Sequence, residues 1–392
     1  MTRLLLRTAV ATALALGTLG PALPATASSS SGGVQTVRVP DGDPRKRSLA
    51  PRTTQPFSLL GVTWDDPDAV LDGTARVRTR SRESGAWSAW RPLDTDVRPP
   101  ETGPDGTRAG VRGSTQPLWT GPSDGVQVRV SGTRLPEGLR VELIDPGSGP
   151  APVVHTVERG AAEPAPGPLA AERPAVTARS TWGADESLVK DPPTYTGATK
   201  AMFVHHTAGT NDYACSESAS IVRGVFLYHV RSNGWNDIGY HFLVDKCGTL
   251  FEGRAGGIDK PVLGAHAYGF NTATSSVSVL GDHSAAAVNP AVRESVAKVA
   301  AWKLGLHQLD PTGTVELTAG ADNGKYKLGE KVTMHRIPGH RDGYPTECPG
   351  QHLYDDLPEI RTLAGNAGKP AEPAEPTAPE PAEPWDEDPL AG

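Results

Sequence analysis

Histidine and cysteine are gathered in one part of this chain, in a pattern suited to metal binding. Ten of the eleven histidines and all three cysteines lie between residues 205 and 352. His205 and His206 end a short apolar run, while His340 and Cys348 lie eight positions apart in a loop rich in glycine and proline. Two imidazoles and one thiolate in tetrahedral geometry, with the fourth position open, form a catalytic zinc site. The sequence therefore predicts a catalytic metal centre.

The segments around these residues alternate between strand-like and helix-like patterns, which is typical of an α/β domain. Strands are predicted at residues 201–206, 238–245, 249–252 and 275–280, and helices at about 216–230, 290–304 and 355–362. Successive side chains on a strand point to opposite faces, so His205 and His206 cannot both bind the same ion. One of the two is therefore a ligand, and turns in the downstream loop can bring His340 and Cys348 to the same place.

The first 27 residues have the features of a secretion signal. Arg3 and Arg7 precede an apolar run at residues 9–19, and residues 25–27 fit a small-residue cleavage site. The apolar run is far shorter than the roughly 20 residues that span a bilayer, and no cysteine follows it for lipid attachment. We therefore predict a secreted protein, extracellular or in the cell wall, without a membrane anchor.

The odd number of cysteines needs an explanation outside the cell, where a pair of cysteines is expected to be oxidised. Cys215 lies shortly after the paired histidines and Cys247 lies in a turn between two apolar runs, so these two can form a disulfide. Cys348 then remains as a thiolate for the metal. Two other pairings, with Cys348 bridged to either partner, stay open.

Composition divides the mature chain into separate parts. We interpret residues 34–157 as an all-β, sandwich-like accessory domain, 158–174 as a linker, 175–365 as the catalytic domain and 366–392 as a disordered tail. The tail repeats Ala-Glu-Pro units, a composition that cannot bury a core. Residues 370–392 hold seven acids and no Lys or Arg, so the folded body is nearly neutral although the net charge is −7. It therefore offers no basic surface for nucleic acid.

The sandwich is predicted from short segments rich in β-branched or aromatic residues. They are residues 55–62, 74–81, 87–92 and 125–130. Trp64, Trp87, Trp90 and Trp119 are candidates for a sugar-stacking platform, although packing is the more common role of tryptophan in a sandwich. Because this domain carries none of the predicted metal ligands, we expect residues 173–366 to fold and to act on small substrates without it.

Several motifs, in order, resemble the zinc amidases that include the peptidoglycan recognition proteins and a phage amidase. They lie within residues 178–363, at 203–209, 234–242, 251–254, 264–267 and 339–350. The resemblance implies a central mixed β-sheet flanked by helices, with a groove over the zinc ion. It also implies hydrolysis of the amide between N-acetylmuramic acid and L-alanine in peptidoglycan. The composition rich in Ala, Gly and Pro is similar to that of secreted actinobacterial members.

Carried over position by position, the resemblance implies roles for individual residues at the metal. The zinc ligands would be His205, His340 and Cys348, with His206 in a supporting role. Tyr240 and Thr346 would be catalytic. Tyr240 would orient the attacking water or donate a hydrogen bond to the oxyanion, and Thr346 would supply a second hydrogen bond.

The resemblance also implies residues that bind the substrate, peptidoglycan. His266 and Asn271 would contact glycan or stem peptide, although a structural role is equally compatible with Asn271. Arg254 would meet a carboxylate or carbonyl of the stem peptide bidentately. Many relatives have Gly-Trp after Glu-Gly-Arg, whereas residues 255–257 are Ala-Gly-Gly, so preference for the third stem residue cannot be transferred. Residues 306–335 insert a polar segment, predicted as a hairpin beside the groove.

Two other functions compete with an amidase. Non-catalytic peptidoglycan-binding members of the family typically lack the cysteine ligand, whereas Cys348 is present here. A cysteine peptidase that uses Cys348 and His340 is less favoured, because the cysteine lies in a loop flanked by proline. The sequence does not place Cys348 at the N-terminus of a helix, a position that would lower the pKa of its thiol.

Overall fold

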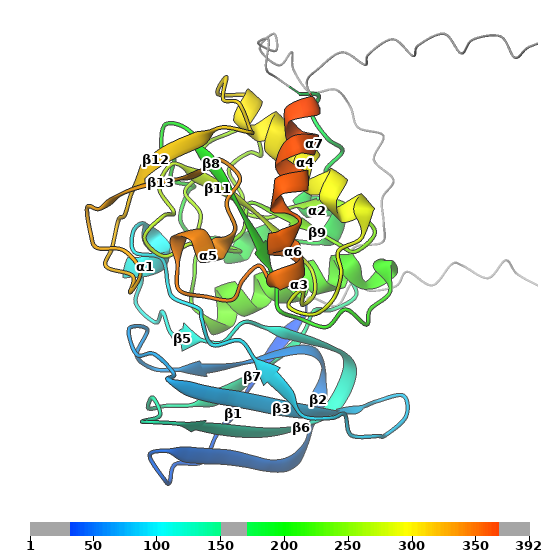
Figure 1. Cartoon of the computed structure of the whole chain (residues 1–392). Coiled ribbons are helices and arrows are strands. Elements are labelled where there is room, and N and C mark those ends of the chain that lie inside the picture. The colour runs from blue at the N-terminus through cyan, green and yellow to red at the C-terminus, as the bar shows by residue number, and fades with distance from the viewer. Residues whose placement is uncertain (1–31, 150–170, 368–392) are drawn as a thin grey trace, which may run out of the picture.

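The computed structural model describes residues 32–149 and 171–367, which form an all-β domain and an α/β domain (Figure 1). The predicted signal peptide lies outside the described residues, as do residues 158–170 of the predicted linker and residues 368–392 of the predicted tail. Among the described residues, no helix combines the length and the apolar character needed to cross a membrane.

The N-terminal domain is one strongly bent antiparallel sheet. Its strands are β1 (Gly33–Arg38), β2 (Lys46–Trp64), β3 (Gly73–Ser81), β4 (Arg91–Leu93), β5 (Gly113–Ser114), β6 (Leu118–Gly132) and β7 (Arg140–Asp145). The order is β1-β7-β2-β6-β3-β4, with β5 paired to β2. Register shifts between β2 and β6 from Leu49 to Leu59 bend both long strands, as bulges do. The bent sheet encloses a core that includes Leu60, Val77 and Val128.

The four tryptophans of this domain do not share one surface. Trp64 is 1% exposed and Trp119 is 5% exposed, so both pack in the interior. Trp87 and Trp90 are half-buried on the outer face, where the Arg78 guanidinium lies 5.3 Å from each ring centroid. The four tryptophans therefore do not form one sugar-stacking platform, and packing, the role that we favoured, accounts for Trp64 and Trp119.

The α/β domain has the predicted mixed sheet flanked by helices. Its strands are β8 (Ala201–His206), β9 (Phe242–Val244), β10 (Leu250–Glu252) and β11 (Thr274–Val279), in the order β10-β9-β11-β8. Strands β8, β11 and β9 run parallel, and β10 is antiparallel to β9. The helices are α2 (Arg179–Trp182), α3 (Ser218–Leu227), α4 (Pro290–Gly305), α5 (His340–Gly343), α6 (Gln351–Asp355) and α7 (Leu357–Asn366). Short helical turns occur at Glu186–Leu188, Cys215–Glu217 and Tyr228–Ser232.

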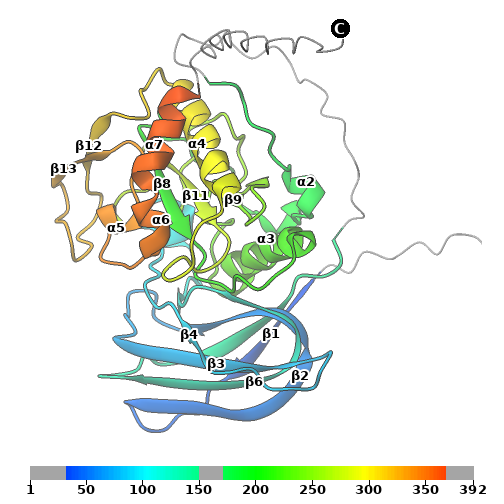
Figure 2. The same ribbon diagram turned by 45° about the vertical axis from the view of Figure 1, so that its right-hand side comes forward.

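One face of this sheet is covered by α4 and α7 (Figure 2). Met202 and Val204 of β8 pack there with Val296 and Trp302 of α4 and with Ile360 of α7. Helix α4 begins where the sequence predicted, because the Asn289 side chain caps it by accepting the N–H of Ala291. The large apolar cluster fixes β8, the strand that carries the two histidines.

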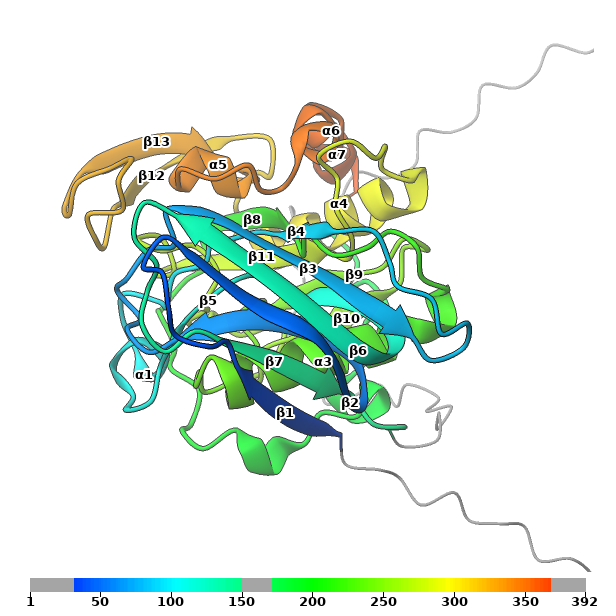
Figure 3. The same ribbon diagram turned by 90° about the horizontal axis from the view of Figure 1, so that it is seen from below.

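The other face packs on α3, and α3 in turn packs on the β domain (Figure 3). Leu59, Trp119 and Ile144 of the β domain share one apolar cluster with Ile221 and Val225 of α3. Polar contacts cross the same boundary: the hydroxyl of Tyr228 donates to Thr115 O at 3.1 Å, and Nε of Arg223 donates to Pro146 O at 2.6 Å. Truncation to residues 173–366 would expose this surface, so the structure does not support our expectation of an independent domain.

The inserted segment forms the predicted hairpin. Strands β12 (Thr314–Thr318) and β13 (Lys331–His335) pair antiparallel, and Leu317 and Met334 pack against Phe203. In the connecting turn, Nδ2 of Asn323 donates to Gly343 O at 2.8 Å. The hairpin thereby braces the end of α5, in the loop that carries His340 and Cys348.

Candidate metal centre

Strand β8 delivers the first candidate ligand to the end of the central sheet. All six residues of β8 are buried, and the strand pairs in parallel with β11 so that His205 lies opposite Ser278. The two histidines have different partners, as strand alternation predicted. His205 faces the downstream loop, while Nδ1 of His206 accepts the N–H of His283 at 3.2 Å. His206 therefore supports the strand end and the loop that follows β11.

The downstream loop brings the other two candidates to His205. Ligand atoms of His205, His340 and Cys348 all lie within 4.8 Å of one another, and Cys348 Sγ is 3.8 Å from His205 Nδ1. The three residues are 1%, 7% and 4% exposed, respectively. The loop closes because Arg341 N–H donates to Cys348 O at 2.9 Å. Thr346 Oγ1 accepts the N–H of Cys348 at 3.1 Å, which makes this threonine a support for the ligand loop.

The donor set fits zinc. His340 Nε2 is buried and has no hydrogen-bond partner within the described part of the chain. Burial lowers the pKa of His340 to about 3 and that of His205 well below its usual value, so both imidazoles are neutral, as ligation requires. Burial raises the pKa of the Cys348 thiol, so a thiolate there needs a positive charge beside it. Neutral imidazoles, a buried thiol and an unpartnered nitrogen together match a zinc site.

The remaining cysteines are joined to each other. Cys215 and Cys247 form a disulfide, the pairing that we expected, and Cys348 is the free, buried cysteine. All three lie within the described residues. The two alternative pairings that the sequence left open are not those of the structure.

Tyr240 stands beside the cluster. Its ring centroid lies 5.4 Å from that of His205, and the side chain is buried. Burial raises the pKa of the Tyr240 hydroxyl, and the nearby Cys348 raises it further. The hydroxyl therefore stays protonated at ordinary pH and can donate a hydrogen bond.

The structure separates the expected roles of His266 and Asn271. Nδ1 of His266 lies 3.2 Å from Nε2 of His205, and His266 lines the cavity next to the cluster. Asn271 lies behind it: its Oδ1 accepts the N–H groups of His266 at 2.7 Å and of Ala267 at 3.0 Å. Nδ2 of Asn271 donates to Glu101 of the β domain at 2.7 Å. Asn271 therefore holds the loop at residues 264–274, which is called the groove loop, and is already paired with the carboxylate of Glu101.

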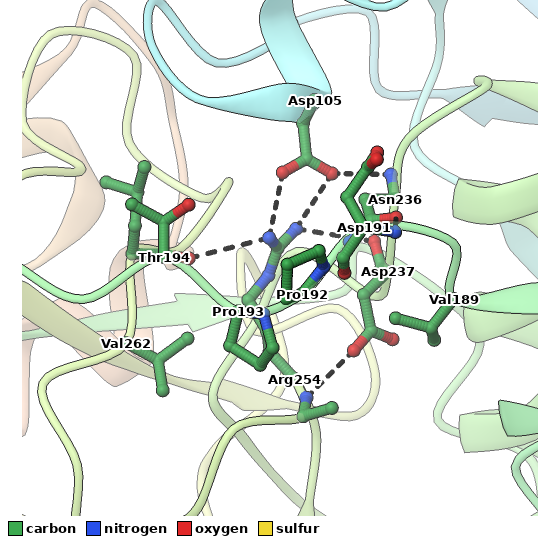
Figure 4. Close-up of a pocket in the computed structure, with 12 residues that line it drawn as sticks. Asp105, Val189, Asp191, Pro192, Pro193, Thr194, Asn236, Asp237, Arg254 and Val262 are labelled. Atoms are coloured by element: carbon green, nitrogen blue, oxygen red, sulfur yellow. Dashed lines mark hydrogen bonds and ion pairs between the residues drawn. The ribbon is translucent and has the colours of Figure 1, made fainter.

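Arg254 is also paired within the chain (Figure 4). Its guanidinium donates to both carboxylate oxygens of Asp105, at 2.8 and 3.1 Å, and Nε donates to Ile238 O at 2.9 Å. Burial alone would raise the pKa of Asp105, but the charge and hydrogen bonds of Arg254 lower it below its usual value. We expected Arg254 to bind a carboxylate or carbonyl of the stem peptide, whereas the carboxylate that it binds in the structure belongs to the β domain.

Sequence reasoning missed the contribution of the β domain to this cavity. Its lining combines Tyr240, His266 and His340 with Asp96, Val97, Arg98 and Gln116. The four residues of the β domain precede His205 by about ninety positions or more in the sequence, and they belong to no recognisable motif. Tyr344 was missed as well; its ring stacks on His340 with centroids 5.5 Å apart. Its position inside the metal loop was a signal that could have found it.

Comparisons with known proteins match the two domains separately. Residues 195–351 match the family model described as N-acetylmuramoyl-L-alanine amidase, and residues 21–167 match Rv3811 N-terminal galactose-binding domain-like. Peptidoglycan-recognition protein SC2 of Drosophila simulans is 29% identical over 189 residues, which are 48% of this chain and 85% of that protein. Peptidoglycan recognition protein 1 of Bos taurus is 29% identical over 186 residues, 46% of this chain and 80% of that protein.

Solved structures are similar to the same half of the chain. Drosophila PGRP-LB has a TM-score of 0.37 and 24% identity, covering 47% of this chain and 92% of that chain. The endolysin N-acetylmuramoyl-L-alanine amidase LysCS from Clostridium intestinale has a TM-score of 0.35 and 20% identity, covering 49% of this chain and 96% of that chain. The family match spans the region that contains the entire candidate metal cluster. Residues 195–351 therefore form a domain of the N-acetylmuramoyl-L-alanine amidase family, the one that the motifs resemble.

Proposed function

We propose that the protein is a secreted, zinc-dependent N-acetylmuramoyl-L-alanine amidase that cleaves the bond between N-acetylmuramic acid and L-alanine in peptidoglycan. The observation that carries the proposal is the buried cluster of His205, His340 and Cys348 beside a cavity. The family match supplies the reaction class. The relatives are named for peptidoglycan recognition, which supports peptidoglycan as the ligand.

The chain's own residues account for metal binding and for stabilisation of the transition state. A bound zinc ion supplies a Lewis acid for the scissile carbonyl and makes water more acidic. His266, within hydrogen-bond distance of His205 Nε2, fixes that imidazole and leaves Nδ1 toward Cys348 for the ion. The protonated hydroxyl of Tyr240 donates a hydrogen bond to the oxygen on which negative charge develops.

The same site argues against the competing functions. Because burial raises the pKa of Cys348, the thiol lacks the thiolate character that a cysteine nucleophile needs. Three converging, buried ligands beside a cavity suit a catalytic zinc site with an open position. The cluster therefore favours hydrolysis over binding alone.

Analysis of muropeptide products tests the proposal. Soluble muropeptides would be incubated with the zinc-supplied protein and with a chelator-treated aliquot, and the products would be identified by mass spectrometry. We expect separated glycan and stem peptide, with a new free amino terminus on L-alanine, in the zinc-supplied sample only. New reducing sugars would indicate a glycosidase, and bound but uncut muropeptides would indicate a recognition protein.

A further inference from the structure

One segment of the β domain borders the cavity beside the candidate metal centre. It consists of residues 94–116, between the end of β4 and the start of β6, and is called the cover segment here. It includes the short helix α1 (Pro104–Thr107) and strand β5. Figure 4 shows α1 holding Asp105 over Arg254 of the α/β domain. The cover segment therefore contacts groove residues far away in the sequence.

The strongest contact is the ion pair of Asp105. This carboxylate is 1% exposed and accepts two hydrogen bonds from Arg254. Its Oδ1 also accepts the backbone N–H of Asn236 at 2.6 Å. Charge-assisted, bidentate hydrogen bonds of this kind are among the strongest in proteins. Asp105 thus anchors the middle of the cover segment to the groove.

A second carboxylate of the cover segment binds the neighbouring groove loop. Glu101 accepts the backbone N–H of Asn271 at 3.3 Å and its Nδ2 at 2.7 Å. Asn271 is the residue that also holds the backbone of His266. The two acidic side chains of the cover segment therefore occupy two sets of donors: the Arg254 guanidinium, which lines a neighbouring pocket, and Asn271, which holds the backbone of His266.

Apolar contacts fill the space between these anchors. Val97 and Val111 of the cover segment pack with Trp235 and Ala265 of the groove, and the Arg98 guanidinium lies 5.7 Å from the Tyr268 ring centroid. Four residues of the cover segment also line the cavity beside the candidate metal cluster, together with Tyr240, His266 and His340: Asp96, Val97, Arg98 and Gln116. The cover segment therefore borders the space next to the cluster.

We propose that the cover segment is an intramolecular competitor of the substrate, and that a muropeptide must displace it to reach the metal. The identity of this substrate rests on the proposed function. A stem peptide carries carboxylates of its own, so it can take over the donors that Glu101 and Asp105 occupy. Only molecules with a displaced cover bind substrate. The apparent affinity is therefore the affinity of the open form multiplied by the fraction of molecules whose cover is open.

Hydrogen exchange on the full chain tests displacement without requiring catalysis. Metal-free protein would be measured with and without a soluble muropeptide at saturating concentration. We expect faster amide exchange in residues 94–116 and slower exchange in the groove loop at residues 264–274. Slower exchange in the cover segment would make it a fixed wall of the groove and overturn the proposal. Unchanged exchange in the cover segment, with or without protection of the groove loop, would overturn it too.

A charge-removing variant of the full chain tests the consequence for turnover. Glu101→Gln keeps the size of the side chain but has one acceptor oxygen instead of two, so one of the two hydrogen bonds from Asn271 becomes neutral and the other is lost. This change should open the cover about fivefold more often. We expect kcat/KM for soluble muropeptides to rise by about the same factor. Asp124→Asn is the matched control, because it removes an ion pair with Arg80 at 2.7 Å within the β domain and should leave kcat/KM unchanged.

The outcomes separate this inference from the proposed function. A fall in kcat/KM for Glu101→Gln would show that the segment helps to bind substrate, contrary to the proposal. If hydrogen exchange shows displacement of the cover segment but neither the wild-type protein nor its variants hydrolyse muropeptides, the cover proposal holds and the amidase assignment fails. If the wild-type protein hydrolyses muropeptides while residues 94–116 become protected, the amidase assignment stands and the cover fails.

Discussion

Replacement of Cys348 by serine is expected to abolish hydrolysis while much of the muropeptide affinity remains. A hydroxyl is a far weaker acid than a thiol, so zinc loses its charged ligand and is held poorly. We expect turnover to fall by at least about a thousandfold, as it does when a central catalytic group is removed. The groove residues His266 and Tyr240 come from other segments and stay in place.

Three measurements on the same preparation separate binding from chemistry in this variant. Zinc content would be measured by plasma mass spectrometry, muropeptide binding by calorimetry and turnover by product analysis. The double variant Cys215→Ser with Cys247→Ser is the matched control. It removes the disulfide and about 2–4 kcal/mol of stability, but should keep zinc and turnover. Wild-type turnover in metal-free Cys348→Ser protein would remove zinc from the mechanism.

Replacement of Tyr240 by phenylalanine is the second change with a large expected effect. It removes one hydroxyl beside the metal cluster and preserves the shape of the ring. Loss of a single oxyanion donor typically lowers kcat by about 10²–10³-fold, and we expect a loss of that size. KM should change little, because the hydrogen bond to this hydroxyl strengthens only as charge develops on the substrate oxygen.

The pH dependence distinguishes a donor from an acid–base group. The pKa of Tyr240 is raised by burial and by Cys348, so its hydroxyl is protonated throughout the ordinary working range. The profile of kcat against pH should therefore keep its shape in Tyr240→Phe and lie lower at every pH. Loss of one limb of the profile would show that Tyr240 titrates during catalysis. Tyr213→Phe is the control. It removes a hydroxyl that accepts the N–H of Lys246 at 2.8 Å, and it should retain full turnover.

The candidate metal cluster was predictable in part from local patterns, while the choice of His205 rather than His206 came from the family resemblance. The apolar run that ends at His206 predicted β8 with the observed bounds, and strand alternation assigned the two histidines to different partners. Turn residues predicted that the downstream loop could bring His340 to Cys348. These features depend on short stretches of sequence, in which strand period and turn chemistry dominate.

The position of the β domain could not be predicted in the same way. Its tight packing on α3 and the contact of Asp105 with Arg254 join residues that are far apart in sequence. Such contacts leave no periodic pattern, and an acidic residue in a loop is ordinarily a solvated one. For the same reason the role expected of Arg254 was incomplete: its chemistry, bidentate binding of a carboxylate, was foreseen, but the partner within the chain was not.

X-ray absorption at the zinc edge on the full-length protein tests the central claim most directly. The account predicts one zinc ion per chain with two nitrogen ligands at about 2.0–2.1 Å and one sulfur ligand at about 2.3 Å. The sulfur contribution should disappear in Cys348→Ser. A zinc-replete, active protein whose spectrum lacks a sulfur ligand would contradict the assignment of His205, His340 and Cys348 as the metal centre.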